Sequence, residues 1–126
     1  LFRSTDACRS WTRLDEGFDQ RYFRSLLVHD GAIYAGSALA HTSTWVEDDA
    51  EPVLFAFRED EGLQPVEHPR PGETVTGLAS VNGRLVASTH RGTLLASAGG
   101  TVQDWTVLAR LPTADPPVSY TPLGTP

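Results

Sequence analysis

Residues 23–37, FRSLLVHDGAIYAGS, constrain the fold more than any other stretch, because they align without a gap on residues 75–89, VTGLASVNGRLVAST. Each copy contains an Asx-Gly pair, Asp30-Gly31 or Asn82-Gly83, flanked by apolar residues that favour β structure. Such pairs supply the positive φ angles of a two-residue type I′ turn. The repeated stretch therefore predicts two β-hairpins.

A second repeated element surrounds these hairpins. Three short apolar segments, at residues 1–4, 54–57 and 94–97, are each followed by a turn and a further strand-like segment, at residues 11–14, 63–66 and 105–108. The starts at Leu1 and Leu94 are 93 residues apart, so two repeats in this span have about 46 or 47 residues each. This period is typical of repeats that consist of four short strands.

The first eleven residues, LFRSTDACRSW, contain a motif of their own. Ser4, Asp6, Ser10 and Trp11 form the pattern Ser-x-Asp-x-x-x-Ser-Trp. The pattern resembles the Asp-box, or BNR repeat, of one class of β-propellers that includes sialidase-, sortilin- and xyloglucanase-like proteins. A third, degenerate copy keeps Ser97 and Trp105 but has Gly99 where Asp is expected, and the middle copy has lost the motif.

The resemblance implies structural roles for the motif residues Ser4, Asp6, Ser10, Trp11, Ser97 and Trp105. In that family the Asp carboxylate accepts hydrogen bonds within its own turn, and the Trp ring packs between neighbouring blades. Short polar side chains satisfy turn backbone groups well, and Trp provides a large apolar contact. Cys8 stands where the family usually has Gly. A positive φ at that position would cost roughly 1 kcal/mol.

These patterns together predict an all-β chain of antiparallel four-stranded blades, forming a partial β-propeller of about two and a half blades. We expect the two outer strands of one blade at residues 1–14 and complete blades at 22–67 and 75–111. Residues 112–126 hold five of the nine prolines. They are interpreted either as a linker-like tail or as the start of a further blade.

Composition excludes several classes of protein. The chain of 126 residues has a net charge of −6, and its ten basic residues, all Arg, are scattered, so we expect no nucleic-acid partner. No apolar run approaches the roughly 18 residues of a membrane span, and no signal-peptide pattern is present. The single cysteine, Cys8, allows no internal disulfide. No Cys/His spacing indicates zinc, so neither a metal nor another cofactor is predicted.

The first group of candidate binding residues lies in a long loop at about residues 38–52. Propellers of this family bind ligands on the face formed by such loops and by the connections between blades. Trp45 could stack on a sugar ring, and His41 could donate a hydrogen bond. Asp48 and Asp49 could bind Ca²⁺ or act as catalytic carboxylates. The alternative is a solvent-exposed loop that carries a cluster of acidic residues.

A second group lies in two other loops expected on the same face, at about residues 68–74 and 89–92. Arg70, His90 and Arg91 are its members. Arg favours bidentate recognition of carboxylates, so Arg70 and Arg91, together with Arg21 in the loop before them, could form an anion-binding rim. The alternative is that they are ordinary solvated surface residues.

The function predicted from these patterns is a non-catalytic binding or scaffold module with a protein or glycan ligand. Two alternatives remain. One is a fragment of a glycoside hydrolase, sialidase- or xyloglucanase-like, and the other is an oligomeric, lectin-like glycan-binding propeller. No catalytic residue is assigned. Because an open set of blades leaves strand edges and apolar faces exposed, we expect self-association or additional blades to close the ring.

Overall fold

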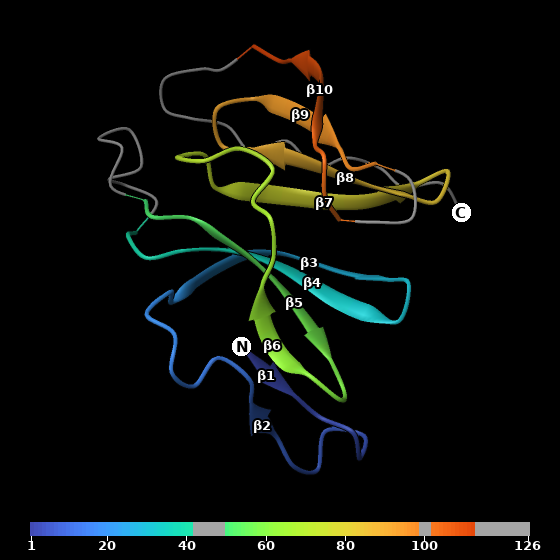
Figure 1. Ribbon diagram of the computed structural model, residues 1–126. Helices are drawn as coiled ribbons and strands as arrows, with labels where there is room; N and C mark the ends of the chain where they lie inside the picture. The colour runs from blue at the N-terminus through green and yellow to red at the C-terminus, as the bar shows by residue number, and fades with distance from the viewer. Residues whose placement is uncertain (42–49, 99–101, 113–126) are drawn as a thin grey trace.

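The computed structural model describes residues 1–41, 50–98 and 102–112, and ten β-strands lie within these ranges (Figure 1). They form three antiparallel sheets, none of them closed. The N-terminal hairpin contains β1 (Phe2–Arg3) and β2 (Thr12–Arg13). The middle sheet contains β3 (Tyr22–His29), β4 (Ala32–Ala38), β5 (Val53–Arg58) and β6 (Gly62–Pro65). The last sheet contains β7 (Val75–Val81), β8 (Arg84–Thr89), β9 (Thr93–Ala96) and β10 (Thr106–Arg110).

The predicted all-β class is confirmed for the described residues, among which no helix occurs. None of them therefore forms a helix with the length and apolar character of a membrane span. Each four-stranded sheet is a meander, because every strand pairs with its neighbour in the sequence. Of the segment 112–126, only Pro112 lies within the described ranges, so both interpretations of that segment remain predictions.

Both predicted hairpins are present, and their turns have the expected geometry. Asp30 and Gly31 have φ angles of 46° and 71°, and Asn82 and Gly83 have φ angles of 50° and 73°. Two positive φ angles in a two-residue loop define a type I′ turn. The repeat extends to irregularities of the strands, because β3 and β7 each shift register at the same repeat position, Arg24 and Thr76 respectively.

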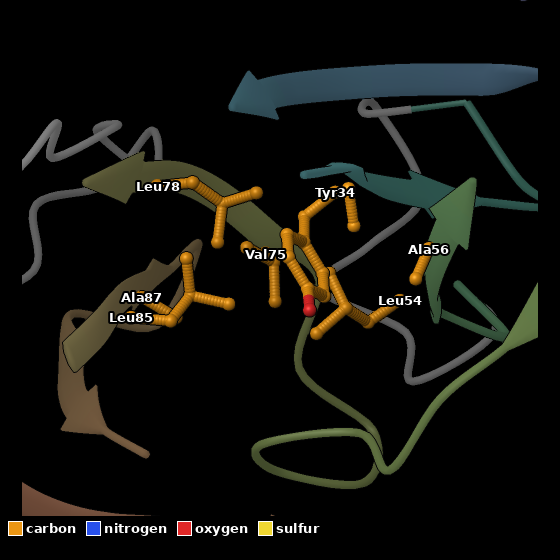
Figure 2. Close-up of a cluster of buried hydrophobic side chains, with 8 residues drawn as sticks. Tyr34, Leu54, Ala56, Val75, Leu78, Leu85 and Ala87 are labelled. Atoms are coloured by element: carbon orange, nitrogen blue, oxygen red, sulfur yellow. The ribbon is translucent and has the colours of Figure 1, made fainter. Parts of the chain in front are cut away.

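The largest core cluster lies between the middle and last sheets. Figure 2 shows Tyr34, Leu54 and Ala56 of the middle sheet meeting side chains of the last sheet. These partners are Val75, Leu78, Leu85 and Ala87. Two hydrogen bonds cross between β3 and β7: Ser25 Oγ donates to the carbonyl of Val75 over 3.2 Å, and His29 Nδ1 lies 3.0 Å from Ser80 Oγ. Apolar burial and polar contacts thus both join these sheets.

Gly36 in β4 lies very close to β7 of the last sheet. A Cβ atom at this position would lie 2.6 Å from the carbonyl oxygen of Val75 and 2.9 Å from its Cβ atom. Real Cβ atoms do not approach backbone this closely. The packing of β4 against β7 therefore depends on a residue without a side chain.

The opposite face of the middle sheet packs against the N-terminal hairpin and the segment after it. Phe55, Phe57 and Leu63 form a second buried cluster, against which Leu1, Leu14 and Phe18, among others, are packed. The Arg3 guanidinium lies 5.1 Å from the centre of the Phe57 ring and also pairs with Glu59. These contacts cover β5 and β6, the two strands of the sheet that lie farthest from β3.

The same face is open over β3. Leu26 and Val28 are 58% and 69% exposed. Through the strand register they lie on the side of Phe55 and Phe57, because side chains of directly paired residues share a face. The N-terminal hairpin covers only the part of this face over β5 and β6, so an apolar surface remains along β3.

The turn between β1 and β2 has the hydrogen bonds expected from Asp6. Its Oδ1 accepts the backbone N–H of Ser10 over 2.9 Å, and its Oδ2 accepts the Ser10 hydroxyl over 2.6 Å. The Ser4 hydroxyl donates to Asp6 Oδ1 over 2.9 Å and accepts the N–H of Cys8, also over 2.9 Å. Cys8 has the positive φ considered from the sequence, at 64°.

The two tryptophans of the motif differ in burial, and the packing expected of Trp11 is not found. Trp11 is 57% exposed. Trp105 instead packs against the cluster between the sheets, and its Nε1–H donates to the carbonyl of Glu67 over 3.2 Å. Glu67 lies in the segment after β6, so this segment of the middle sheet contacts Trp105 of the last sheet. No described segment covers Trp11 in the same way.

Candidate functional site

A surface hollow of about 380 Å³ lies between two connections, the segment 66–74 from β6 to β7 and the turn 90–92 from β8 to β9. Five residues line it: Arg70, Pro71, Gly72, Glu73 and Arg91. Arg70 and Arg91 belong to the second group of candidates. The fold thus brings together two arginines that are 21 positions apart in the sequence.

A turn centred on Pro71-Gly72 positions the charged residues on either side of it. Pro followed by Gly at the two central positions is typical of a type II turn, which requires a positive φ at the second. Gly72 has a φ of 78°, and the N–H of Glu73 donates to the carbonyl of Arg70 over 3.2 Å. The turn brings Arg70 Nε to 2.7 Å from Glu73 Oε1.

Glu73 is the buried anion of the hollow, with its side chain only 9% exposed. Its Oε2 accepts the hydroxyl of Thr89 over 2.6 Å. Burial by itself raises the pKa of Glu73, but the hydrogen bonds from Thr89 and Arg70 and the positive charge of Arg70 help to hold the pKa below its ordinary value. The carboxylate is therefore ionised at neutral pH and balances one of the two arginines.

His90 is a support for the hollow and does not line it. It is only 4% exposed, and its Nδ1 accepts the N–H of Thr74 over 3.0 Å. Its own N–H donates to the carbonyl of Thr74, also over 3.0 Å. Since Nδ1 accepts a hydrogen bond, the ring is assigned as the neutral Nε2–H tautomer. His90 holds the two connections together.

His68 has a similar supporting contact. Its Nδ1 accepts the N–H of Arg70 over 3.2 Å. Burial lowers the pKa of His68, so the ring is neutral at pH 7. The backbone that carries Arg70 is therefore held by a side chain that adds no charge to the hollow.

Guanidinium groups from two connections line the hollow, and guanidinium groups are suited to bind anions. Arg70 is paired with the Glu73 carboxylate, and Arg91 lies on the other connection. Arg91 is exposed, while its backbone N–H is held by the Thr89 hydroxyl over 3.3 Å. This contact holds the turn that carries Arg91, and a planar guanidinium in such a position is suited to bind a carboxylate through two parallel hydrogen bonds.

The first group of candidates is not joined to this hollow. His41 is exposed and packs edge-on against the Tyr22 ring, with ring centres 5.3 Å apart. Trp45, Asp48 and Asp49 lie outside the described residues. Of the motif residues in the last sheet, Ser97 is buried and its hydroxyl accepts the N–H of Leu85 over 3.2 Å, a structural contact.

Two residues that shape the charge of the hollow are not among the sequence candidates: Glu73, which lines it, and Thr89, whose hydroxyl donates to Glu73. A signal for Glu73 was present, because Pro71-Gly72 predicts a turn that brings residues 70 and 73 together. Thr89 had no comparable signal, since its contact with Glu73 spans 16 positions.

In the described part of the chain, no group of three or more His, Cys, Asp or Glu side chains is placed to hold a metal ion. No model of a known protein family matches the chain, and the curated proteins compared with it include none that is similar in sequence. The geometry of the hollow and the arrangement of the sheets are therefore the basis for a functional proposal.

Proposed function

We propose that the chain is a non-catalytic binding and scaffold module, built from Asp-box propeller blades, that holds a carboxylate of a protein or glycan ligand in the hollow between Arg70 and Arg91. In this reading the N-terminal hairpin is the outer half of one blade. The middle and last sheets are two complete blades. The convergence of the two arginines on one hollow is the observation that carries the proposal.

Three features support the assignment to propeller blades. The two four-stranded sheets have the same meander order, and they stack face to face through an apolar cluster. Their first strands share a bulge at the same repeat position. The turn between β1 and β2 has Asp6 at its centre, as the Asp-box resemblance implies. Stacked meanders with repeated irregularities are typical of radially repeated folds.

The scaffold role is supported by the open apolar surface along β3. Leu26 and Val28 lie on a face whose outer half is already packed against the N-terminal hairpin. Strand surfaces of this kind associate with other strands or sheets. In the proposed arrangement another blade covers them, provided either by a further copy of the chain or by additional blades.

The binding role is tested by titrating the chain with small carboxylates and following the Arg side-chain N–H signals by NMR. The probes are D-glucuronate and N-acetyl-L-glutamate, and their neutral counterparts are D-glucose and N-acetyl-L-glutamine. We expect saturable shifts of the Arg91 signals with both carboxylates and none with the neutral compounds. Charge-assisted hydrogen bonds justify a preference of about 10-fold or more.

Arg91→Gln is the informative variant, with an expected loss of about 10-fold in carboxylate affinity. Replacing Arg70 is less suitable, because Glu73 would then be a buried charge without its partner. Arg9→Gln, an exposed arginine in the turn between β1 and β2, is the matched control. Equal affinity of Arg91→Gln and the unaltered chain would contradict the proposal.

A further inference from the structure

A second concave site lies between the outer parts of the middle and last sheets and shares no lining residue with the hollow. Its volume is about 410 Å³, within the range of small-molecule sites. β4, β5 and β6 and the segment after β6 form one side, and residues 102 and 103 contribute from the last sheet. We call it the intersheet groove.

The small side chain of Ala56 explains part of this space. On the opposite face of the same strand, Phe55 and Phe57 fill the interface with the N-terminal hairpin. On the groove side, Ala56 leaves room in front of β5. The hydrogen bond from Trp105 to the carbonyl of Glu67, over 3.2 Å, joins the two sheets beside this space.

Tyr34 is a buried residue that lines the groove, and its hydroxyl is the feature that points to a ligand. The residue is only 3% exposed and lines the groove. Figure 2 shows its ring reaching between Val75 and Leu54, with the hydroxyl at its far end. No hydrogen bond joins this hydroxyl to the described residues. The ring is buried while the hydroxyl oxygen itself is not fully enclosed, so the hydroxyl is accessible to a molecule bound in the groove.

The remaining polar groups give the groove both donors and acceptors. Glu61 and Glu67 contribute exposed carboxylates, which only accept hydrogen bonds, and Arg58 contributes a guanidinium, which only donates. Arg58 is held in place by the carbonyl of Asp30 over 3.3 Å, and the Gln64 amide by the carbonyl of Glu61 over 3.2 Å. Apolar surface lies between them at Pro65, Val66 and Ala56.

The hydrogen-bonding groups of the lining indicate the ligand class. The two carboxylates disfavour an anion, and the Arg58 guanidinium beside them adds a hydrogen-bond donor. A neutral molecule with many hydroxyl groups can donate to the carboxylates and accept from Arg58. Its C–H face can lie on the apolar surface. We propose that the intersheet groove binds a neutral saccharide unit, with the Tyr34 hydroxyl as the hydrogen-bonding group at its floor.

The experiment titrates the full 126-residue chain with D-glucose, D-galactose, D-mannose, D-xylose and N-acetyl-D-glucosamine, followed by two-dimensional amide NMR. We expect saturable binding of at least one sugar, with shifts centred on the amides of β4 and β5. Tyr34→Phe removes one oxygen atom and is expected to weaken this binding about 5- to 10-fold. Tyr22→Phe, whose ring packs against His41 outside the groove, is the matched control and should bind normally.

Four outcomes would overturn the inference. They are the absence of saturable binding by every sugar, equal affinity of Tyr34→Phe and the unaltered chain, tighter binding of L-lysine methyl ester than of any sugar, and sugar binding that only Arg91→Gln removes. The last would assign the sugar to the hollow. Because the two sites share no lining residue, glucuronate binding in the Tyr34→Phe variant tests the hollow separately. A thermal melt of Tyr34→Phe close to that of the unaltered chain establishes that the variant is folded.

Discussion

Asp6 shows at the scale of one residue how a short sequence motif specifies a turn. Its two carboxylate oxygens accept hydrogen bonds from Ser10, and Ser4 supplies a third. These bonds hold Ala7 and Cys8 at φ angles of 57° and 64°. A left-handed conformation costs a residue other than Gly about 1–2 kcal/mol. The hydrogen bonds of Asp6 and Ser4 offset that cost.

The same contacts predict an unusual titration of Asp6. Hydrogen bonds from Ser10 in the first place, and from Ser4, lower the pKa of Asp6 from 3.8 to about 2. Because the folded pKa lies below the unfolded one, the stabilisation is complete above about pH 4 and is lost as the pH falls towards 2. Carboxyl ¹³C NMR measures the midpoint.

Two variants of the turn test whether the hydrogen bonds from Ser10 cause the lowered pKa of Asp6. Ser10→Ala should move the pKa of Asp6 back towards 3.8, because it removes the shortest of these hydrogen bonds. Thr5→Ala, an exposed neighbour in the same turn, should leave the midpoint near 2. An Asp6 midpoint near 3.8 in the unaltered folded chain would show that the hydrogen bonds do not form in solution.

At the scale of the strands, the contact between β4 and β7 depends on shape more than on apolar area. Gly36 leaves room for the carbonyl of Val75, which also accepts the hydroxyl of Ser25. Backbone atoms cannot rotate away as a flexible side chain can. The two strands must therefore separate to accept any additional atom at Gly36.

Gly36→Ala is expected to lower the free energy of unfolding by about 1–3 kcal/mol, the usual cost of overpacking a closely packed interface. Elsewhere the replacement of Gly by Ala at an ordinary φ is stabilising, so the sign of the effect is diagnostic. Urea denaturation followed by circular dichroism measures it.

The Gly36→Ala, Ser25→Ala double variant provides the control. Ser25→Ala removes the nearest side-chain atom but leaves the Val75 carbonyl 2.6 Å from the new Cβ at position 36. The double variant should therefore remain destabilised. A Gly36→Ala chain as stable as the unaltered one would mean that the sheets are farther apart than described here.

At the scale of the whole molecule, the distribution of apolar surface is asymmetric. Beside the intersheet groove, the interface between the middle and last sheets is filled by a cluster of buried side chains. The face of the middle sheet towards the N-terminal hairpin is closed only over its outer strands, and β3 carries two exposed apolar residues, Leu26 and Val28. The proposed scaffold role requires this surface to be covered in solution.

The Leu26→Glu, Val28→Glu double variant tests that requirement. We expect the unaltered chain to show a molecular mass above that of the monomer by light scattering, increasing with concentration. The double variant should remain monomeric at the same concentrations, because two carboxylates on this surface oppose burial. Val107→Glu, Leu108→Glu on β10 changes charge and apolar area similarly at another exposed site and serves as the control. A monomeric unaltered chain, or equal effects of both double variants, would contradict this prediction.

The parts of this protein that depend on local interactions can be predicted from the sequence. Asp30-Gly31 and Asn82-Gly83 specify their turns because few other residues adopt two successive positive φ angles. The hairpins follow from these turns and from the apolar residues beside them. The hydrogen bonds of Asp6 follow likewise from side chains four positions apart. Arg70 and Arg91 are likewise predicted from the sequence as candidates on one face.

Which distant residues meet depends on how the sheets pack. The stacking of the sheets places Glu73 against Thr89, Gly36 against Val75, and the Tyr34 hydroxyl in a groove. It also leaves Trp11 exposed while Trp105 is packed, although both occupy the same place in the repeated motif. These features depend on how one sheet lies on the next. That arrangement is set by the shapes of whole faces, and sequence spacing does not reveal it.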